Sequence, residues 1–331
     1  MAIEAAVRYP RISAKSYEHP ADRAATSALH AIPLIDKVIK RLGEMTIEKR
    51  VRQILLADAV RLGPAQIPAT WQAQVHAASV LDIETPPLYI TQYPLANALT
   101  FGTANPRVIL SSALLTDYQP DEIDAVLAHE LGHVLSEHVY YTTVMVLLQN
   151  LLGGTLSSTP LAGLPVRGLY MLLLEWARAA ELSCDRASAL VTGDPMTTCR
   201  MLMRIAGGPV EGMNVDAFIQ QATEYAEEDD LFARHMRFTS GLGRTHPFAV
   251  RRVRELILWV SSGDYDRIRS GSYIRRGEEP RASAEFEAAV RHYRERFTLV
   301  VERSVGGVAK LSGQIADWLR RTPSAAADDD D

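Results

Sequence analysis

The sequence is poor in the features that mark several large classes of protein. Its 331 residues include only two cysteines, Cys184 and Cys199, which excludes a disulfide framework and favours a reducing compartment. The chain does not open with charged residues followed by an apolar run, so we predict no secretory signal and expect a cytoplasmic protein. The net charge is -5 and there is no basic stripe, so nucleic acid is not an expected partner.

Long hydrophobic runs are also missing. Residues 139–166 carry no charge, but Gln149, Asn150 and Pro165 interrupt this stretch. A helix that crosses a bilayer needs about 20 mostly apolar residues in a row, and no run in this sequence is that long. We therefore expect residues 139–175 to form a buried or interfacial helical hairpin, whose contact with a membrane would be peripheral.

The strongest chemical signal lies at residues 119–138. Pro120 suits the first position of a helix, and apolar residues then recur at helical spacing, so we predict a helix that is buried on one side. Within it, His129 and His133 are four residues apart and share one face. There two imidazoles can hold a single zinc ion, with Glu130 beside them as general base. The alternative is a pair of surface histidines on an amphipathic helix.

Short strands are predicted directly before this helix, separated by turn residues, at residues 88–90, 98–101 and 107–111. We expect them to form a small antiparallel sheet packed on the zinc helix. An edge strand can pair with an extended peptide, so we place the substrate along Asn97, Ala98 and Leu99. A sheet that merely shields the helix is an equally open interpretation.

The spacing of apolar residues predicts helices over most of the remaining chain. In the helix after Thr46 we expect Val51, Ile54, Leu55 and Val60 to face inward. The other predicted helices are 21–42 with a break near Pro33, 68–80, 178–191, 195–206, 214–225, 247–260 and 282–301. The predicted fold class is therefore α+β and mostly helical.

Catalytic zinc needs a third protein ligand and an open position for water. A layout that continues as His-x-x-Gly-x-x-His is excluded because Ser136 and Val139 occupy the last two motif positions. The other layout takes a glutamate from a later helix, which leaves Glu175 and Glu181. We choose Glu181 because Asp185 follows one turn later, where it can accept the ring N–H of a ligand histidine and fix its tautomer. An exposed acidic pair on a surface helix is the alternative.

A third histidine of interest is His246. It follows a glycine-containing loop and precedes Pro247 at a predicted helix start. From there it could swing into a cleft and donate a hydrogen bond to developing negative charge, or it could only cap the helix. His138 has no partner at a useful spacing, and we predict a packing or solvent-facing role for it.

These residues resemble peptidase family M48, which includes HtpX and the type I CAAX prenyl proteases and belongs to the gluzincins. The resemblance rests on His129-Glu130-Leu131-Gly132-His133, on Glu181-Leu182-Ser183-Cys184-Asp185 and on Thr245-His246-Pro247. It extends upstream through Asn97-Ala98 and residues 108–111, and covers residues 85–256. Residues 14–23 also look similar to soluble-type members.

The resemblance implies a zincin-like (gluzincin) core and one Zn²⁺ ion per chain. His129, His133 and Glu181 would bind the ion, and Glu130 would be the general base. Two departures from the family are visible. Cys184 stands where the family usually has alanine. HtpX and the prenyl proteases also have a pair of membrane-spanning helices after the zinc helix, whereas the counterpart in this chain is interrupted.

Further roles follow from the same resemblance. Asp185 would pair with Arg252 behind the ligands, His246 would stabilise the oxyanion, and Asn97 would lie on the substrate-side strand. The sequence pattern also predicts four regions: a helical region that wraps the core (1–84), the catalytic domain (85–262), a helical extension (263–321) and a disordered acidic tail (322–331).

The predicted function is a zinc-dependent metalloendopeptidase that acts on proteins or peptides. Glu130 would take a proton from a water that zinc activates, and would pass it to the leaving amine. Two alternatives stay open. One is a non-catalytic zinc-binding chaperone or scaffold that uses residues 282–319 to bind a partner. The other is a latent protease whose cleft is covered by the hairpin at 139–175 or by the C-terminal helix.

Overall fold

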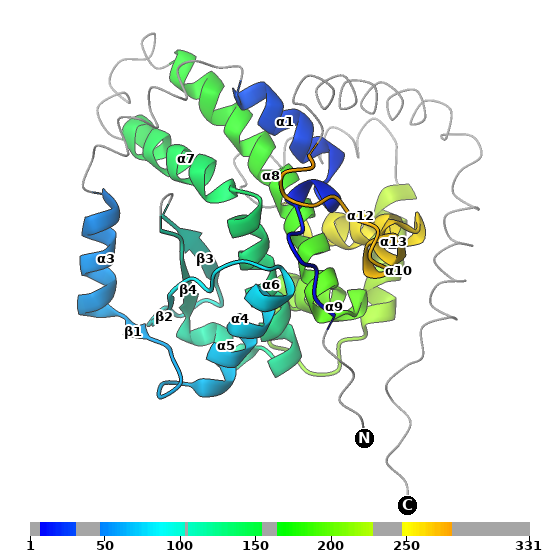
Figure 1. Cartoon of the computed structure of the whole chain (residues 1–331), viewed down its shortest axis with the longest axis horizontal. Coiled ribbons are helices and arrows are strands. Elements are labelled where there is room, and N and C mark those ends of the chain that lie inside the picture. The colour runs from blue at the N-terminus through cyan, green and yellow to red at the C-terminus, as the bar shows by residue number, and fades with distance from the viewer. Residues whose placement is uncertain (1–6, 31–46, 103–104, 154–163, 228–246, 280–331) are drawn as a thin grey trace, which may run out of the picture.

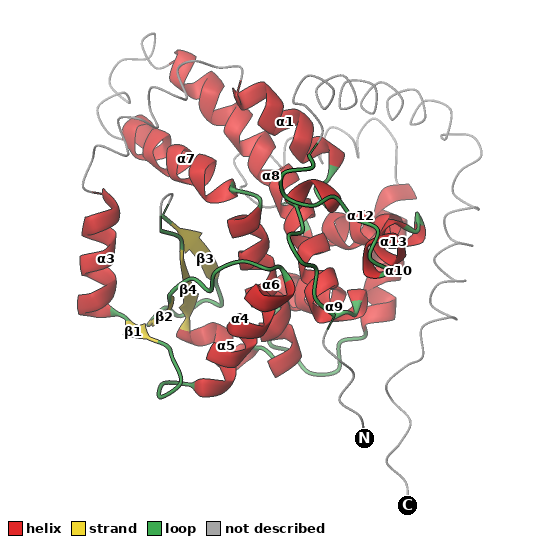
Figure 2. Ribbon diagram, in the orientation of Figure 1, coloured by secondary structure: helices red, strands yellow, loops and turns green. Residues whose placement is uncertain are grey.

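The computed structural model describes residues 7–30, 47–102, 105–153, 164–227 and 247–279 (Figure 1). This part of the chain is mostly helical with one small sheet, as predicted for an α+β protein (Figure 2). The predicted helix at 282–301 and the predicted acidic tail at 322–331 lie outside the described residues. The same is true of residues 31–42 of the first predicted helix.

The sheet has four strands in the order β1-β2-β4-β3: β1 Val60–Arg61, β2 Leu88–Thr91, β3 Ala98–Phe101 and β4 Arg107–Ser111. β1 pairs with β2, and β3 pairs with β4, in antiparallel fashion, but β2 and β4 run parallel. The predicted antiparallel sheet is therefore wrong, because the sheet is mixed. The reason is that β3 lies on the far side of β4 and does not return beside β2. Spacing along the sequence does not reveal such a crossing.

Helices make up most of the described structure. Their bounds are η1 Ala14–Ser16, α1 Pro20–His30, α3 Ile47–Asp58, α4 Pro68–Val80, α5 Ser112–Asp117, α6 Pro120–Leu135, α7 His138–Gly153, α8 Leu164–Thr192, α9 Pro195–Gly207, α10 Val215–Glu227, α12 Ala249–Ser261 and α13 Asp264–Arg269. The predicted helix at 68–80 is α4. α8 is a single helix of 29 residues, which joins the end of the predicted hairpin to the helix predicted at 178–191.

The main core is built around α6 and α8, which pack against each other. Leu127 and Leu131 of α6 are fully buried there. The N-terminal segment contributes Tyr9, Ile12 and Tyr17, which are at most 1% exposed. Residues that precede the first long helix are therefore part of the core that supports the α6 motif.

α7 and the first half of α8 pack against each other around a second hydrophobic cluster, which includes Val144, Leu173 and Trp176. This arrangement agrees with the predicted helical hairpin. Among the helices of the described residues, none is long and apolar enough to cross a membrane.

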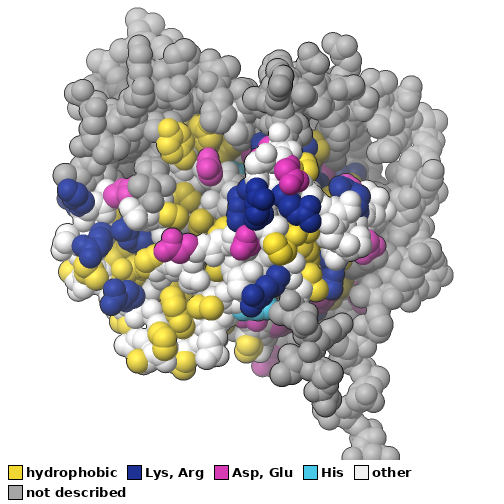
Figure 3. All heavy atoms as spheres, viewed as in Figure 1, with side chains coloured by type: hydrophobic (Ala, Val, Ile, Leu, Met, Phe, Trp, Pro, Cys, Tyr) yellow, Lys and Arg dark blue, Asp and Glu magenta, His cyan; other side chains and the backbone are white. Residues whose placement is uncertain are grey.

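The outer surface corrects one prediction. Ile54 is 53% exposed and Val60 is 45% exposed, whereas Leu55 is buried as expected. Only one side of α3 is covered, and helical spacing assigned Ile54 to that side. Val60 lies beyond the end of this helix, in β1. Figure 3 shows basic and acidic side chains interspersed on the described surface of this face.

Candidate metal centre

The two motif-bearing helices approach each other closely at Gly132. A Cβ atom at this position would lie 2.9 Å from the Cβ of Ala187 and 3.2 Å from the Cα of Cys184, both on α8. Such distances are too short for an ordinary van der Waals contact. The glycine of the His-Glu-Leu-Gly-His motif therefore allows the close approach of α8, which carries Glu181.

The Nε2 atoms of both motif histidines face one carboxylate. The Nε2 atom of His129 lies 3.4 Å from Oε2 of Glu181, and that of His133 lies 3.3 Å from Oε1. All three side chains are largely buried, with His133 the most exposed at 16%. The structure thus brings together the three residues that were predicted as ligands. Glu175, the other candidate, also belongs to α8, but its side chain is outside the described part.

Behind His129 lies a buried ion-pair network. The Nδ1 atom of His129 is 3.1 Å from Oδ1 of Asp185. Arg252 of α12 donates to both oxygens of Asp185 at 2.6 and 2.8 Å, and its Nη1 atom is 3.0 Å from Oε2 of Glu181. This guanidinium balances two carboxylates that would otherwise repel each other in a dry environment. Asp185 and Arg252 are the two residues that the family resemblance pairs, and they are in contact here.

The network shifts the pKa values of its members. Burial lowers the pKa of His129, but hydrogen bonds to Asp185 and Glu181 outweigh burial and raise it to about 9. Burial raises the pKa of Asp185, and the charge and hydrogen bonds of Arg252 more than reverse this effect. For His133, burial dominates and lowers the pKa, with only partial compensation by Glu181. The carboxylates of Asp185 and Glu181 therefore favour positive charge at His129 in the metal-free protein.

Glu130 points toward the sheet. The hydroxyl of Thr100 on β3 donates to Oε2 of Glu130 at 2.7 Å. Both side chains are buried, at 7% and 6% exposure. This bond fixes the glutamate against the edge strand, on the side where the sequence places the substrate.

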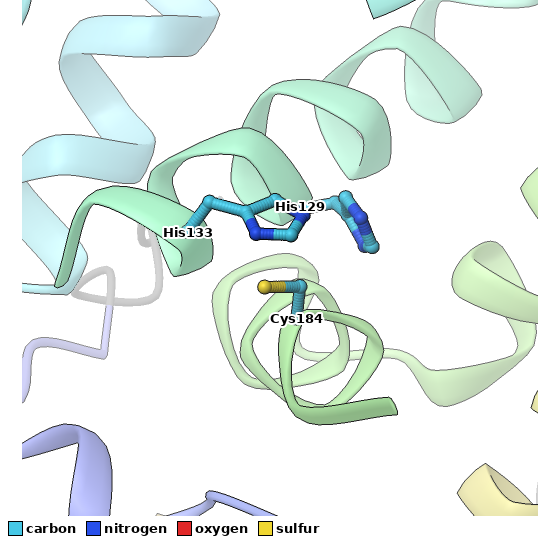
Figure 4. Close-up of side chains that lie close together, drawn as sticks. All are labelled: His129, His133 and Cys184. Atoms are coloured by element: carbon cyan, nitrogen blue, oxygen red, sulfur yellow. The ribbon is translucent and has the colours of Figure 1, made fainter. Parts of the chain in front are cut away.

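Cys184 is a competing ligand candidate. Its thiol and the rings of His129 and His133 offer donor atoms that lie within 4.8 Å of one another (Figure 4). However, Sγ of Cys184 is 3.5 Å from Nδ1 of His138, which itself is 3.2 Å from Nδ1 of His133. The thiol is thus associated with the Nδ1 side of His133, opposite to Glu181.

The chemistry of the donors also favours Glu181. Burial, together with nearby carboxylates, raises the pKa of the Cys184 thiol well above its usual value. In the metal-free protein the thiol is therefore uncharged, and it contacts His138. Two imidazole nitrogens and one carboxylate form a ligand set of known catalytic zinc sites. The residues that are present therefore fit a zinc ion.

Sequence reasoning did not predict the contacts of two residues near the motif, His138 and Asp22. His138 was predicted to be a packing or solvent residue, and its 2% exposure agrees with packing. Its contact with His133 was not predicted. Its Nε2 atom lies 2.9 Å from Oδ2 of Asp22, a residue of α1. The helical spacing conceals this contact because Glu137 adopts a left-handed conformation with φ 56°, which ends α6 and turns α7 back. The sequence feature that comes nearest to this contact is the similarity of residues 14–23, which include Asp22, to soluble-type members of the family.

An open pocket adjoins His133, with a volume of about 170 Å³. Asn97, Ala98, Leu99 and Thr100 line one side of it, next to Glu130, His133 and Glu181, and α7 and α8 contribute Val139, Thr142, Met145, Trp176, Ala177 and Ala180. The three predicted substrate residues therefore lie at the pocket. The backbone N–H of Asn97 donates to Oγ of Ser111 at 2.8 Å, which ties the start of β3 to β4. His246 lies outside the described residues.

Comparison with known proteins assigns the class. The profile of peptidase family M48 matches residues 69–260. The chain belongs to this family, which confirms the resemblance seen in the motifs. A metal cofactor and a protein or peptide substrate are the general features of such metallopeptidases.

Individual relatives agree with this assignment. The chain is 34% identical over 266 residues to the plastoglobule-localized metallopeptidase 48 of Arabidopsis thaliana chloroplasts, which covers 77% of this chain and 75% of that protein. It is 29% identical over 206 residues to protease HtpX homolog 1 of Streptomyces coelicolor, which covers 54% of this chain and 66% of that protein. No solved structure gives a significant match. The predicted cytoplasmic location has no support in these relatives, because the Arabidopsis protein is named as chloroplastic.

Proposed function

We propose that the chain is a zinc-dependent metalloendopeptidase with a zincin-like (gluzincin) core. The observation that carries the proposal is the convergence of the two Nε2 atoms of His129 and His133 on the Glu181 carboxylate. Glu130 lines the pocket that opens beside them. A purely structural zinc site tends to use four protein ligands and has no need of an adjacent base.

In the proposed reaction the protein's own groups move the protons. A bound zinc ion would supply a Lewis acid that lowers the pKa of water and polarises a carbonyl group. Glu130 would take the proton from the attacking water and deliver it to the leaving amine. Because Oε2 of Glu130 accepts the Thr100 hydrogen bond, we assign the proton transfer to Oε1. The role of oxyanion donor that the resemblance gives to His246 belongs to the same proposal.

The substrate would bind in an extended conformation along β3. This strand is at the edge of the described sheet, and its outer edge can accept another strand. A peptide in this position would pass the pocket, whose wall from α7 and α8 is mainly apolar. We therefore expect an apolar substrate side chain to be seated between Met145, Trp176 and Ala180.

The decisive experiment on function uses Glu130→Gln. This variant keeps the shape of the side chain and the acceptor for Thr100, but it cannot accept the proton from water. We expect it to bind zinc stoichiometrically and to cleave a peptide library at least ~10²-fold more slowly than the parent. Glu211→Gln, which alters an exposed carboxyl outside the pocket, should cleave at the parent rate.

The same assay addresses the alternatives. Turnover that survives in Glu130→Gln would remove the general base from the proposal. A parent protein that binds zinc but cleaves no peptide would favour the non-catalytic scaffold or the latent protease.

A further inference from the structure

We propose that Asp22 and His138 are positioning residues that hold the ring of His133 in one tautomer and one orientation for metal binding. Two segments outside the motif would thus complete the metal centre: the start of α1 and the start of α7. The inference rests on the proposed function, because it assumes that His133 is a ligand through Nε2.

The three side chains form a continuous buried chain of contacts. Nδ1 of His133 lies 3.2 Å from Nδ1 of His138, and Nε2 of His138 lies 2.9 Å from Oδ2 of Asp22. Asp22 and His138 are 1% and 2% exposed. A buried carboxylate this close to an imidazole needs complete hydrogen bonding, so the arrangement leaves little freedom for either ring.

The other partners of Asp22 fix the direction of every hydrogen bond. The hydroxyl of Ser183 donates to Oδ2 at 2.6 Å, and that of Thr26 donates to Oδ1 at 3.2 Å. The backbone N–H of His19 donates to Oγ of Ser183, and the indole N–H of Trp176 donates to Oγ1 of Thr26, both at 2.9 Å. Each hydroxyl receives one bond and makes one bond. Asp22 is therefore an acceptor throughout, and the partner nitrogen of His138 must carry a proton.

The proton on Nε2 of His138 in turn determines which nitrogen of His133 carries a proton. A neutral His138 with its proton on Nε2 has a bare Nδ1 atom, which can only accept. The Cys184 thiol lies 3.5 Å from the same atom, but an S–H group is a weak donor. The facing Nδ1 atom of His133 is the stronger donor, and its donation leaves Nε2 of His133 without a proton. That lone pair is the one that faces Glu181 and that a metal ion would use. The opposite tautomer of His138 would place two N–H groups against each other.

The two motif histidines are thus supported from opposite sides. Asp185 of α8 accepts from Nδ1 of His129 directly. Asp22 of α1 acts on His133 through one intervening ring, which is held edge-on against Trp176 with the ring centroids 5.5 Å apart. Ring partners of this kind orient metal ligands, and their loss commonly weakens metal binding by 10–100-fold.

Zinc affinity of Asp22→Asn and His138→Phe tests the inference. We expect each variant to bind zinc about 10–100-fold more weakly than the parent in competition with a chromophoric chelator. His138→Gln, which can donate to Asp22 and accept from His133, should recover part of the affinity lost in His138→Phe. Asp22→Asn should cause no further loss in the His138→Phe background, because the two residues act through one chain of contacts.

A matched control separates positioning from stability. Glu255→Gln alters another buried histidine–carboxylate pair, in which Nε2 of His19 lies 3.4 Å from Oε2 of Glu255 on α12. It should lower the resistance of the metal-free protein to urea without changing zinc affinity. Cobalt(II) in place of zinc provides a second measurement, since its visible spectrum should change in Asp22→Asn and stay unchanged in Glu255→Gln.

The outcomes are distinct. If the parent binds zinc and the folded Asp22→Asn and His138→Phe variants bind it equally tightly, the inference is overturned and the proposed function stands. Losses that add in the double variant would overturn the inference in the same way. If one variant does not fold, His138→Gln and the remaining variant decide by the same comparison. A parent that binds no zinc overturns both the proposed function and this inference.

Discussion

Each histidine of the α6 motif has its Nδ1 atom held by a different part of the chain. Asp185 holds His129, and His138 contacts His133. Both contacts are buried, and a charged group that loses a buried partner destabilises the folded state strongly. The residues around the motif therefore affect stability as well as metal binding, and the two effects are measurable separately in the metal-free protein.

The acid sensitivity of the metal-free protein is one such measurement. Burial alone raises the pKa of Asp22, but His138, Ser183 and Thr26 outweigh it and lower the pKa from 3.8 to about 2. A carboxyl with a depressed pKa stabilises the fold above its unfolded pKa, and this stabilisation is lost as the pH falls through the folded pKa. We expect the free energy of unfolding of the parent to fall by roughly 2 kcal/mol between about pH 4 and pH 2 for this reason.

Asp22→Asn should lose that part of the pH dependence, although it is less stable than the parent at pH 7. Urea unfolding at a series of pH values, with metal removed, measures both curves. Parallel curves for parent and variant would show that Asp22 titrates alike in the folded and unfolded chain.

At the scale of elements, the approach of α8 to α6 decides where Glu181 lies. The sequence predicts the helix α6, because the spacing of its apolar residues is a local property. It also favours Glu181 over Glu175 as the third metal ligand, because the partner Asp185 lies on the same helix one turn away. The sequence did not predict the parallel pairing of β2 with β4, or the contact of His138 with His133. Those features depend on where a strand crosses and on the left-handed backbone of Glu137, which no local spacing encodes.

Gly132→Ala tests the close approach. Alanine would favour the helix by about 1 kcal/mol, but its Cβ atom would meet that of Ala187 at 2.9 Å. We expect α8 to shift and zinc affinity to fall by about tenfold. A second substitution, Ala187→Gly, removes the other Cβ atom and should restore part of the affinity. Unchanged zinc binding in the single variant would show that the helix spacing is not critical.

At the scale of the whole molecule, the two ends of the described chain meet. The backbone N–H of Ser13 donates to the carbonyl of Ile274 at 2.9 Å, and Arg276 pairs with Asp82 at 2.9 Å. Ile12 and Arg275 form an isolated bridge. The N-terminal segment that carries Asp22 is thus held in part by residues after α13. The domain boundaries predicted at residues 84 and 262 remain predictions.

Two truncations test this closure. A chain that ends at Glu279 keeps all of these contacts and serves as the reference. A chain that ends at Gly271 loses them, and its free energy of unfolding should be lower by about 1–3 kcal/mol. Equal stability of the two truncated chains would contradict the role of residues 272–277. Higher peptidase activity in the chain ending at Glu279 than in the full chain would favour the latent protease.

Zinc content after dialysis against a mild chelator tests the central claim most directly, with Glu181→Ala compared with Cys184→Ala. Both side chains lie on α8 and face the histidines, but only the carboxylate contacts both Nε2 atoms. We expect Glu181→Ala to lose its zinc and Cys184→Ala to retain one ion per chain. Zinc retained by Glu181→Ala and lost by Cys184→Ala would contradict the assignment of Glu181 as the third ligand.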